Sequence, residues 1–151
     1  MELKHIPAQL AIGKTVRTSL RKIVQGIGDW PTRIWNETQS HKLQVTGAPV
    51  YIYRGCGNDP EQDFELQICQ PVASLASYTG EFEKIELRAL QCFEAVYIGT
   101  MPEMSSKGWD PFMMEVAQSG RKTTGEAREV YIQWHDFLSP QNQVLLQMEV
   151  E

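Results

Sequence analysis

The stretch VYIYR at Val50–Arg54 recurs as VYIQW at Val130–Trp134 within a chain of 151 residues. The second copy begins 80 positions after the first (130 − 50). Alternating β-branched and aromatic residues are typical of a strand in a half-buried sheet. Two such strands at a fixed offset predict that one supersecondary unit is present twice.

The same offset aligns residues that mark turns and strand centres. The aligned pairs are Gly28 with Gly108, Pro31 with Pro111, Pro60 with Pro140, and Leu66-Gln67 with Leu146-Gln147. Glycine and proline punctuate secondary structure, so their agreement in the same order indicates a duplicated unit better than any single match does.

Each half is predicted to run strand, helix, strand, strand. In the first half these elements are a strand at Leu10–Thr18, helical turns over 20–27 and from Pro31, and strands at Val50–Arg54 and Phe64–Gln70. In the second half they are a strand at Leu87–Gly99, a helix with Asp110 as N-cap, Pro111 at its first position and Gly120 as its stop, and strands at Glu129–His135 and Gln143–Val150. Residues 73–80 are small and polar and indicate a linker.

These elements predict an α+β fold in which a duplicated β-α-β-β unit forms a curved antiparallel sheet. We expect one domain over residues 1–151, with repeat halves at about 5–72 and 84–151. Period-two alternation sorts the strand side chains onto two faces. The face that carries the helices is predicted to hold Val50, Ile52, Phe64, Leu66 and Ile68, with Val130, Ile132, Val144, Leu146 and Met148. The opposite face is predicted to hold Tyr51, Tyr53, Glu65, Gln67, Glu129, Tyr131 and Gln133.

Composition and charge exclude several classes of function. The net charge of −5 disfavours a phosphate-binding surface, so we expect no direct nucleic-acid binding. The sequence has no long apolar run and no secretory leader, which predicts a cytoplasmic protein without a membrane partner. Cys56, Cys69 and Cys92 lack ligand spacing, as do the three histidines, so neither a metal nor a cofactor is predicted.

Positions where the halves differ are candidates for a specialised site. Pro49 in the first half corresponds to Glu129 in the second, so only one half carries the carboxylate. A carboxylate among aromatic rings can bind an organic cation, or activate a water if burial raises its pKa. The alternative is a solvated strand glutamate. The aromatic candidates are Tyr51, Tyr53, Tyr97 and Tyr131.

Two residues of the second helix region join this candidate site. Trp109 and Met113 lie on an apolar stripe at helical spacing, which is more often core than ligand wall. Trp30 and Trp35 in the first half could also wall a pocket, but the core is favoured for them for the same reason.

The motifs PVYIYRG, FELQICQPV and REVYIQW together resemble the GyrI-like small-molecule-binding domain, which is also the effector-binding module of AraC-type and MerR-type transcription regulators. The resemblance implies a pseudo-twofold sheet curved into a cradle, with helices outside and a ligand cleft between the halves. It also implies that Glu129, which precedes Val130 and Tyr131, is the family's central cleft glutamate. Where the family often has a histidine, this chain has Ile98.

The function that follows as an expectation is binding of lipophilic, aromatic or cationic small molecules, as in multidrug recognition. With only six residues before the first strand region, no DNA-binding element is expected, and a role in transcription regulation would need a partner. One alternative is a hydrolase that opens strained, cyclopropane-type toxins with Glu129 as general base and Tyr131 or Trp109 beside it. A further alternative is inhibition of a protein such as a topoisomerase, with residues Tyr78 to Phe82 as the partner surface. The oligomeric state stays open.

Overall fold

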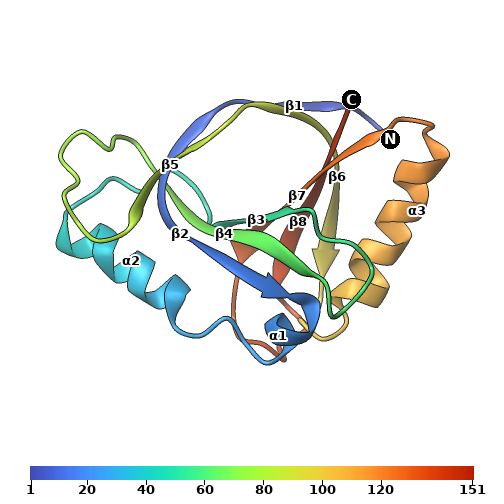
Figure 1. The fold of residues 1–151 in the computed structure, drawn as a ribbon, viewed down its shortest axis with the longest axis horizontal. Helices are drawn as coiled ribbons and strands as arrows, with labels where there is room; N and C mark the ends of the chain where they lie inside the picture. Colours follow the sequence, from blue (N-terminus) through green and yellow to red (C-terminus); the bar gives the residue numbers. More distant parts are fainter.

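The computed structural model describes all residues from 1 to 151, arranged as a curled sheet flanked by helices (Figure 1). Its elements are β1 (Lys4–Ile6), β2 (Gln9–Ser19), α1 (Leu20–Val24), α2 (Trp30–Ser40), β3 (Val50–Arg54), β4 (Asp63–Val72), β5 (Glu83–Leu87), β6 (Leu90–Ile98), the π-helical segment η1 (Met104–Trp109), α3 (Asp110–Gln118), β7 (Thr123–Gln133) and β8 (Gln143–Val150). None of the helices is long and apolar enough to cross a membrane.

One antiparallel sheet of eight strands has the order β1-β6-β8-β7-β3-β4-β2-β5. Elements related by the 80-residue offset take equivalent places on either side of the β7–β3 pair. Val50 and Val130, which the offset makes equivalent, are partners in that pair. The local twofold axis therefore passes through this residue pair, and the predicted α+β fold with a duplicated unit is confirmed.

The two halves exchange their outermost strands. β1 precedes the first unit but pairs with β6 of the second, whereas β5 precedes the second unit but pairs with β2 of the first. The strand predicted over Leu87–Gly99 is present as β6, but it begins at Leu90, and the separate strand β5 that ends at Leu87 was not predicted. The chain breaks between β5 and β6 because these strands hydrogen-bond to different neighbours.

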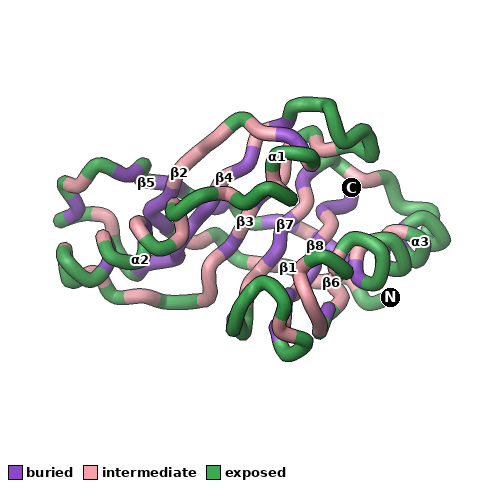
Figure 2. Tube along the Cα trace, turned by 90° about the horizontal axis from the view of Figure 1, so that it is seen from below, coloured by how far each residue is buried: buried purple, intermediate pink, exposed green.

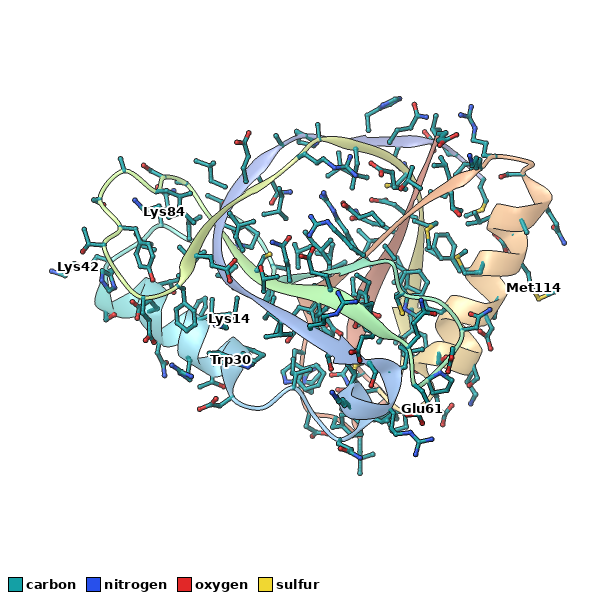
Figure 3. All side chains as sticks on the ribbon, in the orientation of Figure 1. Lys14, Trp30, Lys42, Glu61, Lys84 and Met114 are labelled. Atoms are coloured by element: carbon teal, nitrogen blue, oxygen red, sulfur yellow. The ribbon has the colours of Figure 1, made fainter.

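The two longer helices bury their apolar sides on the same face of the sheet. Ile34 of α2 packs in a cluster with Leu66 and Ile68, and Phe112 of α3 packs in a cluster with Val144 and Leu146. Figure 2 shows burial concentrated along the central strands, while the outer sides of both helices are exposed. Met114 on α3 illustrates this, since its side chain points away from the sheet (Figure 3).

The predicted division of strand residues between the faces is confirmed for β4 and β8, whose apolar residues lie beneath the helices, but it is wrong for β3 and β7. Tyr51 is paired with Ile68 and Tyr53 with Leu66, so these tyrosines share the helix-bearing face with the apolar residues of β4. Likewise Glu129 is paired with Leu146 and lies on that face. Val50, Ile52, Val130, Glu65 and Gln67 lie on the opposite face. A hairpin register that differs by one residue moves every side chain of a strand to the other face, and the loop sequences do not reveal that register.

The start of the second helix also differs from its prediction. Asp110 is helical rather than a cap, with φ −60° and ψ −51°, because η1 runs directly into α3. Pro111 does lie in the first turn of α3. The continuous helical path brings Trp109 to the base of α3 and against the sheet.

The segment from Tyr78 to Phe82 is not an exposed partner surface. The side chains of Tyr78 and Phe82 are 1% and 7% exposed and belong to the core cluster beneath α2. The Tyr78 hydroxyl donates to Glu37 on α2 at 3.1 Å and accepts from the Phe82 backbone N–H at 2.9 Å. These hydrogen bonds and contacts hold the segment between the two repeat halves against α2.

Candidate functional site

Glu129 lies at the centre of the helix-bearing face, one residue from the local twofold axis, and is 3% exposed. Its Oε1 accepts a hydrogen bond from the hydroxyl of Tyr53 at 2.7 Å and another from that of Tyr131 at 2.8 Å. Its Oε2 accepts a hydrogen bond from the indole N–H of Trp109 at 2.7 Å. One carboxylate thus accepts hydrogen bonds from three aromatic side chains.

These three donor side chains come from three different parts of the fold. Tyr131 is two residues beyond Glu129 on β7, so both side chains leave the same face of the strand. Tyr53 comes from the neighbouring strand β3 and Trp109 from the junction of η1 with α3. Tyr51, the register partner of Glu129, places its ring 4.5 Å from the ring of Tyr131. Four aromatic rings therefore enclose the carboxylate.

No positively charged side chain pairs with Glu129. The ion pairs of the chain all involve other carboxylates. Burial raises the pKa of Glu129 above its ordinary value, and the hydrogen bonds from Trp109, Tyr53 and Tyr131 oppose that rise. Burial and the neighbouring Glu129 carboxylate also raise the pKa of Tyr53 and of Tyr131, so both phenols stay protonated and act as donors.

This arrangement has two chemical capacities. A carboxylate offers about four acceptor positions, so three donors leave room for one further hydrogen bond from a ligand or a water. An anion held by neutral donors in a low-dielectric site also attracts a cation strongly, since little solvent screens it. The site is thus suited to an organic cation or to a bound water.

A cavity of about 160 Å³ adjoins the aromatic cluster on the side of α2. Tyr51 forms one wall, and Ile34, Trp35, Pro31 and Pro49 are among the others. Trp35 is 46% exposed, so its predicted place in the core is wrong. Helical spacing cannot separate a core tryptophan from one at the rim of a cavity, and no signal in the sequence pointed to Pro31 and Pro49 as lining residues.

Not all of the site residues predicted from the sequence lie beside Glu129. Tyr51, Tyr53, Tyr131 and Trp109 surround Glu129, as described above. The hydroxyl of Tyr97 instead donates to the carbonyl of Thr100 at 2.6 Å, and its ring is in the core under α3. Met113 packs against the same core cluster. Nowhere in the chain do three His, Cys, Asp or Glu side chains group as a metal site would require.

No protein-family model and no curated protein sequence matches this chain, so its similarities are found in three dimensions. The C-terminal domain of EcmrR superposes with a TM-score of 0.79 at 18% identity, with 99% of this chain and 96% of that one covered. In an EcmrR–DNA complex the match covers 99% of this chain and only 56% of the regulator, with a TM-score of 0.77 and 19% identity. This chain thus spans little more than half of that regulator.

Two further solved structures share the architecture. SAV2435 bound to tetraphenylphosphonium has a TM-score of 0.70 at 15% identity, covering 99% of this chain and 93% of that one. A hydrolase encoded by lin2189 of Listeria innocua has a TM-score of 0.61 at 11% identity, covering 99% and 91%. The expected GyrI-like domain is confirmed as the fold of this chain.

Proposed function

We propose that this chain, which has the fold of the GyrI-like domains, binds lipophilic, aromatic or cationic small molecules against the carboxylate of Glu129. The observation that carries the proposal is a buried carboxylate with three neutral donors and no ion-pair partner. An unpaired buried charge is costly to a fold. A bound organic cation supplies the missing opposite charge.

The aromatic surroundings favour a cation with a large apolar body. Rings of tyrosine and tryptophan attract a cation through their electron-rich faces and bury its hydrocarbon surface. The cavity beside Tyr51 is the proposed entrance for such a ligand, because Tyr51 lines the cavity and is also the register partner of Glu129. The phosphonium complex of SAV2435 supports this ligand class, because that cation has no N–H and relies on charge and rings.

Titration with tetraphenylphosphonium tests the proposal. We expect saturable binding by the native protein and a loss of about tenfold or more in affinity for Glu129→Gln, because glutamine keeps an acceptor for the aromatic donors but removes the charge. Isothermal titration calorimetry measures both affinities. Glu94→Gln, which alters a carboxylate on the opposite face, is the matched control and should bind as the native protein does. Equal affinity in the native protein and Glu129→Gln would refute the role of the carboxylate.

A second candidate function is hydrolysis of a strained electrophile. It is favoured by the raised pKa of Glu129 and by the remaining acceptor position, which together suit a general base. The carboxylate would take a proton from water as the water oxygen attacks a ring carbon, while the strained ring C–C bond breaks and the departing carbon takes up a proton, so that one water is added in total. Tyr131 and Trp109 would hold the carboxylate in place. The structural similarity to the lin2189 hydrolase supports this alternative.

Mass spectrometry of cyclopropane-bearing electrophiles incubated with the protein separates the two functions. Hydrolysis adds the mass of one water to the compound, and this product should be absent with Glu129→Gln. Binding without any such product supports the binding function alone. A product formed equally by Glu129→Gln would come from another site or from solution.

A further inference from the structure

The face of the sheet opposite the helices, called the concave face below, contains a cavity of about 430 Å³ that is separate from the Glu129 site. Side chains alternate along β7, so Arg128 and Val130 point to the face opposite Glu129, and both line this cavity. Its volume falls within the range of roughly 300–1,000 Å³ that is common for small-molecule sites. The sheet body thus lies between the two sites.

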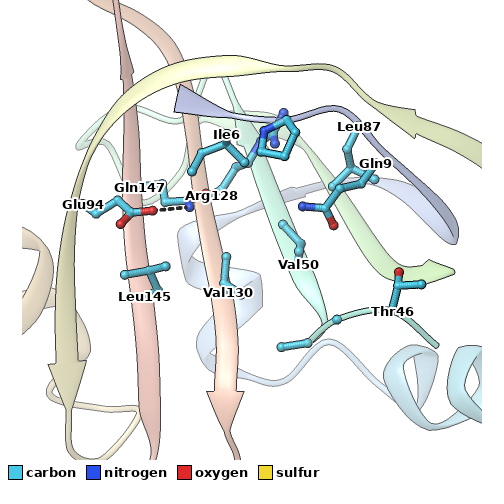
Figure 4. Close-up of a pocket in the computed structure, with 13 residues that line it drawn as sticks. Ile6, Gln9, Thr46, Val50, Leu87, Glu94, Arg128, Val130, Leu145 and Gln147 are labelled. Atoms are coloured by element: carbon cyan, nitrogen blue, oxygen red, sulfur yellow. Dashed lines mark hydrogen bonds between the residues drawn. The ribbon is translucent and has the colours of Figure 1, made fainter. Parts of the chain in front are cut away.

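Neighbouring strands build the floor of this concave-face cavity. Val50 pairs with Val130, and Val130 with Leu145, so three apolar side chains form a row across β3, β7 and β8. The outer strands curl over this row, because Ile6 at the end of β1 and Leu87 at the end of β5 line the same cavity. Figure 4 shows the row beneath these strands. An apolar body would be buried between floor and roof.

The polar groups lie on the two sides of the floor (Figure 4). On one side Gln147 donates through Nε2 to Oε1 of Glu94 at 2.9 Å. Oε2 of Glu94 makes no hydrogen bond within the protein, and Glu94 takes part in no ion pair. On the other side the amide of Gln9 lines the cavity, also without a hydrogen bond from its side chain. Both sides therefore offer unused acceptors.

The charges near the cavity cancel except for that of Glu94. Arg128 bonds to Glu126 at 3.0 Å and to the carbonyl of Arg88 at 3.1 Å, so its charge is already matched. The surrounding ion pairs join three arginines to three carboxylates, namely Arg54, Arg88 and Arg128 with Glu65, Glu126 and Glu149. The carboxylate left over is Glu94, at the rim of the apolar floor.

We propose that the concave-face cavity is a second binding site, which takes small protonated amines with an apolar body. The ammonium group donates to the free oxygen of Glu94, and the apolar body lies on Val50, Val130 and Leu145. Recognition requires an N–H donor here, whereas the proposed ligand of Glu129 needs only charge and rings. This inference does not depend on the function proposed for Glu129.

Calorimetric titration with 4-phenylbutylamine at pH 7 tests this site, and it is made on the Glu129→Gln variant because the amine is also an aromatic cation of the class proposed for the Glu129 site. We expect Glu129→Gln to bind the amine and the double variant that adds Glu94→Gln to bind it about tenfold or more weakly, because the charge-assisted hydrogen bond is lost while an acceptor for Gln147 remains. Leu145→Trp should abolish binding by filling the cavity. Urea unfolding of each variant establishes that it is folded.

Three results would overturn the proposal. The first is no binding of the amine by Glu129→Gln. The second is binding by Glu129→Gln that the added Glu94→Gln leaves unchanged, which would show that Glu94 does not bind the ammonium group. The third is equal affinity for 4-phenylbutanol, the uncharged analogue. Because tetraphenylphosphonium reports on Glu129 alone, failure of either site is seen separately.

Discussion

Arg128→Met is expected to lower the free energy of unfolding by about 3–5 kcal/mol, the range for removing one partner of a buried ion pair. Arg128 is 2% exposed and its guanidinium holds Glu126, which is 5% exposed. Burial lowers the pKa of Arg128, and Glu126 opposes that effect. Methionine fills similar space but leaves Glu126 with only the more exposed Arg54 and Arg88.

Urea unfolding followed by circular dichroism measures this loss. Arg21→Met is the matched control, because Arg21 pairs with Glu61 while both side chains are 63% exposed. Exposed pairs contribute about 0–1 kcal/mol, so the control should remain close to the native protein. A loss at Arg128 no larger than that of the control would show that the three arginines of the concave face are interchangeable.

The repeat was readable from the sequence because it depends on local features. Strand alternation at Val50–Arg54 and Val130–Trp134, together with turn residues at a constant offset, specified both the elements and their duplication. The pairing of Val50 with Val130 then follows from the twofold relation of the halves. The exchange of β1 and β5 was not readable, since pairing between distant strands leaves no local pattern.

The candidate site was predicted in part. The difference between Pro49 and Glu129 directed attention to the carboxylate, and the structure brings Tyr53, Tyr131 and Trp109 onto it. The face was assigned wrongly because it depends on hairpin register, which moves all side chains together when it changes by one residue. Tyr97 was grouped with the others by residue type, yet its hydroxyl is satisfied by the Thr100 carbonyl.

The concave-face cavity had no signal in the sequence. Glu94, Gln147 and Gln9 are ordinary polar residues of strands, and Ile6 and Leu87 read as apolar strand ends. They meet because the outer strands exchange between the halves and curl over the floor. A site made by strand exchange is visible only once the long-range pairing is known.

Glu129→Gln is expected to stabilise the protein increasingly as the pH rises. Burial raises the pKa of Glu129 in the folded state above its ordinary value of 4.5. Between the unfolded-state pKa and the higher folded-state pKa of Glu129, the folded protein binds more protons than the unfolded chain. The native protein therefore loses stability as the pH rises through this window. The glutamine variant lacks this loss. The difference in unfolding free energy should therefore grow with pH and become constant above the folded-state pKa, reaching about 1.4 kcal/mol for each unit of upward shift.

Urea unfolding of both proteins between about pH 4 and pH 8 measures this difference, and carboxylates common to both cancel from it. A difference that stays flat or shrinks with rising pH would show that Glu129 is not an anion destabilised by burial. Saturating tetraphenylphosphonium should remove the pH-dependent loss from the native protein, because the cation favours the ionised carboxylate. Without ligand, the unpaired charge of Glu129 destabilises the folded protein, and a bound cation would restore that lost stability. The substitution Glu129→Gln should therefore raise the free energy of unfolding and lower the affinity for the cation.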